Sequence, residues 1–69
     1  MASEYLIANG RKVEVTFPTS IESFLVMQKL LPRSVVVEHN GEAVAPSEFA
    51  NRVLNPGDHL EIVKIVAGG

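Results

Sequence analysis

The chain has 69 residues, of which 46% are hydrophobic and 20% are charged, which allows one domain near the lower size limit for a fold stabilised by a hydrophobic core alone. Its net charge of −2, without blocks of like charge, argues against nucleic acid as a partner, because phosphate binding requires a basic surface. The absence of cysteine excludes disulfides, thiolate metal ligands and a cysteine nucleophile.

The N-terminal stretch MASEYLIANG lacks the basic start and long apolar run of a signal peptide. No later segment is apolar over the roughly 20 residues that a membrane-spanning helix needs. A chain without cysteine also suits a reducing compartment. We therefore expect a cytoplasmic protein with no membrane partner.

Residues 4–17 predict a β-hairpin. Asn9 and Gly10 form the pair best suited to a two-residue turn, because both residue types tolerate positive φ. From residue 13 to residue 17 every second side chain is apolar, which is typical of a strand with one buried and one solvated face. The register of the first arm stays open, since Leu6 or either of its neighbours could face inward.

A helix is predicted to follow and to run to about Leu31. Thr19 or Ser20 could cap its N-terminus, and Glu22 stands at the capping-box position when counted from Thr19. Pro32 is expected to end the helix, because proline cannot donate the next backbone hydrogen bond.

The apolar residues of this helix are spaced so as to lie on one face. They are Ile21, Phe24, Leu25 and Leu31, with Leu30 beside them. Val26 and Met27 widen the apolar arc, and we expect them to flank the core rather than to contact a partner.

Valine-rich residues 34–39 predict a further strand, and the Asn-Gly pair at 40–41 predicts a tight turn into a short strand around 43–45. A short helical turn is expected over residues 46–52, with Ser47 as its cap. Its anchors in the core are expected to be Phe49 and Val53.

The sequence NPGD at 55–58 predicts another turn, which leads into a last strand over residues 60–66. A hairpin, one main helix and later strands exclude a doubly wound fold and favour a mixed sheet around one helix. His39 and His59 lie near turns, and we expect both at the surface. Without a third ligand or a paired nucleophile, neither a metal site nor an enzyme active site is predicted.

The last strand changes its pattern part way along. Residues 60–62 alternate as a core strand does, but Lys64 then falls on the core side. A one-residue bulge or burial on both faces would explain the change. We favour the alternative, in which the strand runs past the end of the core and offers Val63, Ile65 and Val66 to a partner.

The last three residues, Ala67, Gly68 and Gly69, suggest a second point of contact with a partner. Glycines without β-carbons can enter a narrow channel, and three extended residues span roughly 10 Å. The Gly69 carboxylate could then reach the active site of another protein and be activated there as an acyl-adenylate. That enzyme would supply ATP and Mg, so the chain itself would bind no cofactor and hold no catalytic residue.

The order of TSIESFLVMQKLL, HNGEAVAPSEF, NPGD and VAGG along the chain resembles the ThiS family of sulfur carriers in thiamin biosynthesis. The resemblance implies an α+β fold of the ubiquitin-like β-grasp type, with a mixed sheet of four to five strands packed on one main helix. It further implies a domain over residues 1–66 and a flexible reactive tail over residues 67–69.

The resemblance also implies a reaction cycle. A ThiF-type adenylyltransferase, similar to ubiquitin-activating enzymes, would adenylate Gly69, and sulfur from a cysteine desulfurase would convert it to a thiocarboxylate. A ThiG-type thiazole synthase would then accept the sulfur. Ala67 and Gly68 would pass through the partner's channel, while Val63, Ile65 and Val66 would form the partner-binding face.

Two alternatives remain at this stage. The small subunit of molybdopterin synthase has the same fold, tail and thiocarboxylate. A non-covalent ubiquitin-like binding module would use the face of the last strand, and its tail would be inert. Deletion of Gly69 distinguishes the carriers, which would lose all function, from the binding module, which would not.

Overall fold

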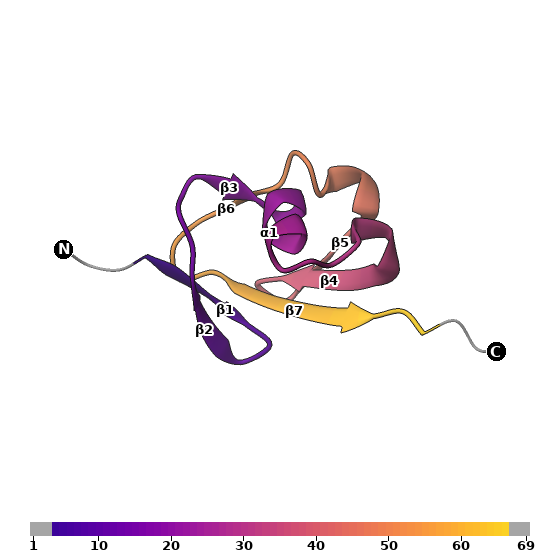
Figure 1. Ribbon diagram of the computed structural model, residues 1–69, viewed down its shortest axis with the longest axis horizontal. Helices are drawn as coiled ribbons and strands as arrows, with labels where there is room; N and C mark the ends of the chain where they lie inside the picture. The colour runs from indigo at the N-terminus through magenta and orange to yellow at the C-terminus, as the bar shows by residue number, and fades with distance from the viewer. Residues whose placement is uncertain (1–3, 67–69) are drawn as a thin grey trace.

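The structure is a computed structural model that describes residues 4–66. One α-helix covers one face of a five-stranded sheet, and a two-stranded sheet lies beside the helix (Figure 1). The elements are β1 (Tyr5–Ala8), β2 (Arg11–Glu14), β3 (Thr19–Ser20), α1 (Ile21–Met27), η1 (Pro32–Ser34), β4 (Val35–His39), β5 (Glu42–Val44), η2 (Pro46–Glu48), β6 (Val53–Leu54) and β7 (His59–Lys64). No helix within residues 4–66 has the length and apolar character needed to cross a bilayer.

The five-stranded sheet has the order β2-β1-β7-β4-β5. β1 and β7 pair in parallel, whereas the other neighbours are antiparallel. The sheet is therefore mixed, and strands from the two ends of the described chain meet at its centre. This confirms the predicted α+β fold of the ubiquitin-like β-grasp type, with five strands in the main sheet.

Both Asn-Gly pairs form the predicted hairpin turns. Asn9 and Gly10 have φ values of 52° and 80°, and Asn40 and Gly41 have values of 52° and 86°. Positive φ at both central residues is the mark of the turn type whose twist matches that of antiparallel strands. The turns thus fix the registers of β1 with β2 and of β4 with β5.

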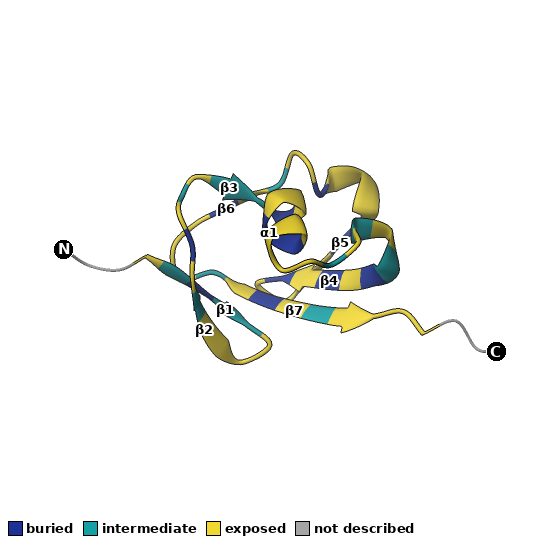
Figure 2. Ribbon diagram, viewed as in Figure 1, coloured by how far each residue is buried: buried dark blue, intermediate teal, exposed yellow. Residues whose placement is uncertain are grey.

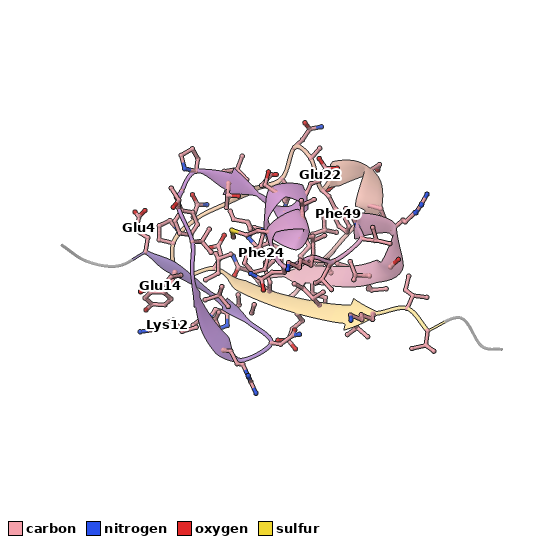
Figure 3. The ribbon with its side chains drawn as sticks, in the orientation of Figure 1. Glu4, Lys12, Glu14, Glu22, Phe24 and Phe49 are labelled. Atoms are coloured by element: carbon pink, nitrogen blue, oxygen red, sulfur yellow. The ribbon has the colours of Figure 1, made fainter. Side chains whose placement is uncertain are left out.

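The core lies between α1 and the inner face of the main sheet, where Figure 2 shows buried positions on β1, β4, β7 and α1. Leu6 is fully buried, which settles the register of the first arm. Phe24 of α1 and Phe49, just after η2, supply the largest buried side chains (Figure 3). Full burial of side chains of this size contributes about 1.5–3 kcal/mol each.

The helix begins where it was predicted to begin, and of the two predicted caps it is Ser20 that is used. Ser20 is the N-cap, and its Oγ accepts a hydrogen bond from the Ser23 backbone N–H at 3.1 Å. Because the cap is Ser20 and not Thr19, Glu22 does not occupy the reciprocal position of a capping box.

The predicted C-terminus of the helix was wrong: α1 ends at Met27, well before Pro32. Lys29 adopts a left-handed φ of 62°, and the Leu30 N–H donates to the Leu25 carbonyl at 2.9 Å. This 6→1 bond is that of a Schellman motif, in which a left-handed residue stops the helix. The turn brings Leu30 against the core and leaves Leu31 at the surface.

Leu31 and Val53, which were predicted to face the core, are exposed, and so are Val26 and Met27, which were predicted to flank it. Val26 and Met27 lie on the solvent side of the short α1. Val53 pairs with Ser20 in the two-stranded sheet, so its neighbour Leu54 becomes the buried anchor. Ser47 makes no capping bond, since η2 begins after Ala45 without a side-chain cap.

Replacing Lys29 with glycine should raise the free energy of unfolding by roughly 0.5 kcal/mol. The change removes about 1–2 kcal/mol of left-handed strain and costs about 0.5–1 kcal/mol of backbone entropy. Gln28→Gly is the matched control, because Gln28 has an ordinary φ of −84°; this variant should lose stability in urea unfolding. Equal losses from both variants would contradict this account of the helix end.

Candidate functional site

The second half of β7 extends beyond the core. β7 keeps an unbroken antiparallel register with β4, in which Val63 faces Val36 and Lys64 faces Val35. This register excludes the bulge considered from the sequence. Ile62 is half-buried and Lys64 is exposed, so the change of pattern marks the place where the core ends.

The apolar residues at this end of β7 are exposed, which also excludes burial on both faces. The exposed fractions are 63% for Val63, 56% for Ile65 and 85% for Val66. Val36, exposed to 53%, faces Val63 from β4. We call these four residues the β7 patch.

Val36 was not singled out from the sequence, although its position between the inward-facing Val35 and Val37 indicates an outward side chain. The role of the β7 patch in binding a partner stays a prediction. The predicted tail residues Ala67, Gly68 and Gly69 lie outside the described residues.

A polar cluster lies at the opposite end of β7. His39 is buried, and its Nε2 lies 2.6 Å from Asp58 Oδ2. Arg52 Nε donates to His39 Nδ1 at 3.1 Å. Because Nδ1 accepts this bond, the imidazole carries its proton on Nε2 and donates it to Asp58.

Asp58 gathers further hydrogen bonds at the turn before β7. It accepts from the Asn55 backbone N–H at 2.9 Å and from Asn40 Nδ2 at 3.3 Å. Burial acts to raise the pKa of the Asp58 carboxyl, but the hydrogen bonds from His39, Asn55 and Asn40 outweigh burial and lower this pKa. The carboxylate thus joins the turn at Asn40 to the turn over residues 55–58.

Arg52 extends the cluster to the surface. It binds Glu42 through Nη2, and its Nη1 lies 3.7 Å from Glu48 Oε1. The hydrogen bond from Arg52 lowers the pKa of Glu42. Both ring nitrogens of His39 are occupied by protein partners, so the cluster has the bonding of a structural network.

The expectation that His39 lies at the surface was wrong, whereas His59 is exposed. The alternation of Val35, Val37 and His39 was the signal for an inward side chain. Within residues 4–66, no group of three His, Cys, Asp or Glu side chains is placed to hold a metal ion.

Comparisons with known proteins agree with the fold. The model of the ThiS family matches residues 2–69. A thiazole synthase from Paramagnetospirillum magneticum is 36% identical over 64 residues, which are 93% of this chain; the chain spans only 20% of that protein's length.

Two solved structures are similar, both of a thiamine biosynthesis protein from Geobacter metallireducens. The crystal structure matches with a TM-score of 0.81 at 26% identity, and the match covers 94% of this chain and 99% of the chain in that structure. The NMR structure has a TM-score of 0.77 at 26% identity, with coverages of 94% and 87%.

Asp58→Asn should lower the free energy of unfolding at pH 7 by about 1–3 kcal/mol, because an amide oxygen cannot replace both carboxylate oxygens as acceptors. The folded pKa of Asp58 lies below the unfolded value of about 3.9, so its stabilisation is complete above that pH and is lost as pH falls through the folded pKa. Urea unfolding from pH 7 to pH 2 should therefore show wild type and variant converging in acid. Parallel curves would contradict this role for Asp58.

Proposed function

The chain belongs to the ThiS family, and on that ground we propose that it is a sulfur carrier in thiamin biosynthesis and not itself an enzyme. The observation that carries the proposal is the family match over residues 2–69, which includes Gly68 and Gly69. The similar solved structures bear the name of a thiamine biosynthesis protein, which favours the thiamin pathway over molybdopterin synthesis.

The proposed reaction takes place at the carboxylate of Gly69. In the partner enzyme, a carboxylate oxygen attacks the α-phosphate of ATP and pyrophosphate leaves, with Mg supplied by that enzyme. The terminal sulfur of a persulfide then attacks the acyl carbon and AMP leaves, which forms an acyl disulfide. A thiol cleaves the S–S bond, becomes part of a new disulfide and releases the thiocarboxylate.

The geometry of the described residues supports this role. β7 carries the chain past the core at Lys64, and the next two residues, Ile65 and Val66, are exposed. The β7 patch lies directly before the proposed tail, residues 67–69. A partner that held this patch would therefore hold the tail close to its own active site, which reduces the entropy cost of positioning Gly69.

A ThiG-type thiazole synthase is the proposed acceptor of the sulfur. Support comes from the thiazole synthase of Paramagnetospirillum magneticum, which contains a segment similar to 93% of this chain. A carrier and an acceptor within one polypeptide would meet at high effective concentration. The activating partner is proposed to be a ThiF-type adenylyltransferase, and the sulfur is proposed to come from a cysteine desulfurase.

The first test is formation of the thiocarboxylate. The protein should be incubated with ATP, Mg, an activating enzyme of this type, a cysteine desulfurase, cysteine and a thiol reductant. Intact mass and C-terminal fragmentation should show replacement of one oxygen by sulfur at Gly69, dependent on ATP. The reaction should fail completely when Gly69 is deleted.

An unchanged mass, with the activating enzyme shown to be competent on another carrier, would exclude the carrier function and favour the non-covalent binding module. Circular dichroism of the Gly69 deletion is the control for folding: β7 ends at Lys64, so loss of residue 69 should remove none of the described secondary structure and leave the spectrum unchanged.

The second test concerns the β7 patch. Val63→Gln should raise the KM of the activating enzyme for this protein about tenfold while kcat stays unchanged, as expected for loss of an apolar contact used in binding. Val53→Gln is the matched control, since Val53 is a similarly exposed strand valine outside the patch. Equal effects of the two substitutions would remove the patch from the proposed interface.

A further inference from the structure

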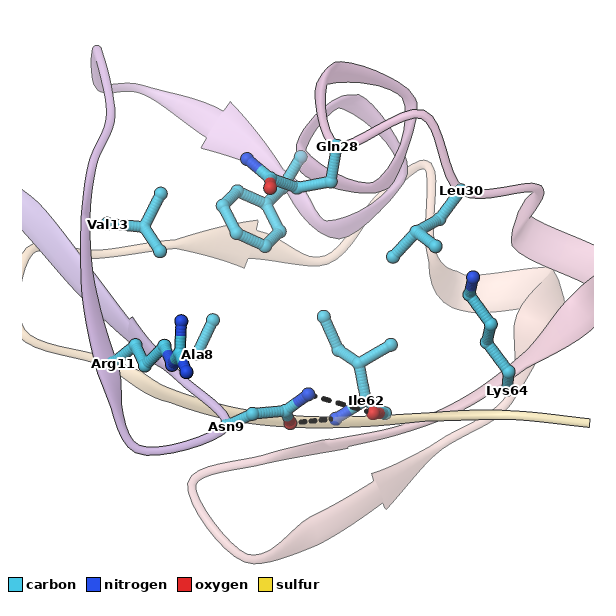
Figure 4. A pocket seen from close by; sticks show the side chains of 9 residues that line it. Ala8, Asn9, Arg11, Val13, Gln28, Leu30, Ile62 and Lys64 are labelled. Atoms are coloured by element: carbon cyan, nitrogen blue, oxygen red, sulfur yellow. Dashed lines mark hydrogen bonds between the residues drawn. The ribbon is translucent and has the colours of Figure 1, made fainter.

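A groove runs between β7 and the C-terminal end of α1. It consists of two hollows of about 480 Å³ and 230 Å³, which share Leu30 and Lys64. Figure 4 shows the larger one, with Val13 and Leu30 on opposite sides and Ile62 between them. We call the two hollows together the α1–β7 groove. Its apolar surface and its volume are in the range of ligand-binding clefts.

The charges around this groove are all positive. Arg11, Lys29 and Lys64 line it, and no aspartate or glutamate does so, although the chain as a whole has a net charge of −2. Among residues 4–66, none of these three cations has an ion-pair partner. An anionic group in the groove would therefore meet complementary charge.

The backbone of β7 is also open toward this groove. The pairing of β1 with β7 ends at Ala8 and Leu60, and the Asn9 side chain then takes the place of a strand. Asn9 Oδ1 accepts from the Ile62 N–H at 2.7 Å, and Asn9 Nδ2 donates to the Ile62 carbonyl at 3.0 Å.

Lys64 is the next residue whose backbone groups point to the same side as those of Ile62, because these directions alternate along a strand. Its N–H and C=O have no backbone partner among the described residues on that side. An edge of this kind is where an extended peptide can add to a sheet.

We propose that the α1–β7 groove binds an extended segment of a partner protein that carries apolar side chains flanked by carboxylates. The apolar side chains occupy the hollows, the carboxylates pair with Arg11, Lys29 and Lys64, and the peptide backbone bonds to β7 at Lys64. The open edge favours a peptide over a small anion, because a peptide can both donate to the Lys64 carbonyl and accept from its N–H, whereas an anion can only accept. This proposal goes beyond sulfur transfer and does not depend on it.

The test is an NMR titration of the ¹⁵N-labelled full chain with the capped peptide Asp-Asp-Val-Phe-Val-Val-Asp-Asp. Saturable shifts are expected at the amides of Asn9, Leu30 and Lys64. The same peptide with lysine in place of every aspartate should cause no saturable shift. Inorganic phosphate serves as the small-anion probe and should not displace the acidic peptide at equal concentration.

Charge-reversal variants test the residues of the groove. Arg11→Glu and Lys64→Glu should each weaken binding of the acidic peptide about tenfold, because each replaces an attraction by a repulsion. Lys12→Glu is the matched control: it makes the same change of charge one residue away, but Lys12 lies over the Tyr5 ring on the other face of the sheet. This control should change the affinity less than about twofold.

Four results would overturn the proposal. They are no saturable shift with the acidic peptide, shifts confined to the β7 patch, equal loss of affinity in the Lys12 control, and displacement of the peptide by phosphate. The last would assign the groove to small anions. Sulfur transfer is not used as a readout, so failure here leaves the carrier function untouched.

Discussion

The parallel pairing of β1 with β7 is the constraint on which the other features of this protein depend. It is short, with bonds from the Ile7 N–H to the Asp58 carbonyl and from the Asn9 N–H to the Leu60 carbonyl, each 2.9 Å long. It places β7 between β1 and β4, so Leu60 is fully buried. Because β1 turns away at Asn9, only β4 continues beside the rest of β7. The exposed end of the strand and the open edge at Lys64 both follow from this difference in length.

The two ends of β7 differ in character. At the start of β7, the side chains of His39, Asp58 and Arg52 form a network in which each ring nitrogen of His39 has a hydrogen-bond partner. At its far end, valine and isoleucine side chains meet solvent. The strand is therefore firmly held where it enters the sheet and accessible where it leaves. A strand with an exposed far end suits a protein whose proposed reacting group must enter another protein.

Much of the fold could be predicted from local signals in the sequence. The two Asn-Gly turns and the alternation over residues 13–17 require only local backbone chemistry and were predicted correctly, although β2 itself ends at Glu14. The end of α1 was missed because its left-handed position is a lysine and not the usual glycine, and packing of Leu30 on the core outweighs that preference.

The environment of His39 was missed for a different reason. Its partners Arg52 and Asp58 come from turns 13 and 19 positions away, and no local pattern links them. For the candidate site, the pattern around Lys64 correctly predicted that the strand leaves the core. The contribution of Val36 depends on the pairing of β4 with β7, which only the tertiary structure supplies.

The central position of β7 also bears on how the protein is made. Asn9 and Ile62 are 53 positions apart, yet their contact lies at the middle of the sheet. During synthesis, β1 and β4 have no strand between them until β7 has left the ribosome, so contacts of this sequence separation form late. A chain truncated before β7 lacks the centre of its sheet and exposes apolar surface to proteases. Protein quality control would thus remove chains that lack β7 before they could compete for a partner.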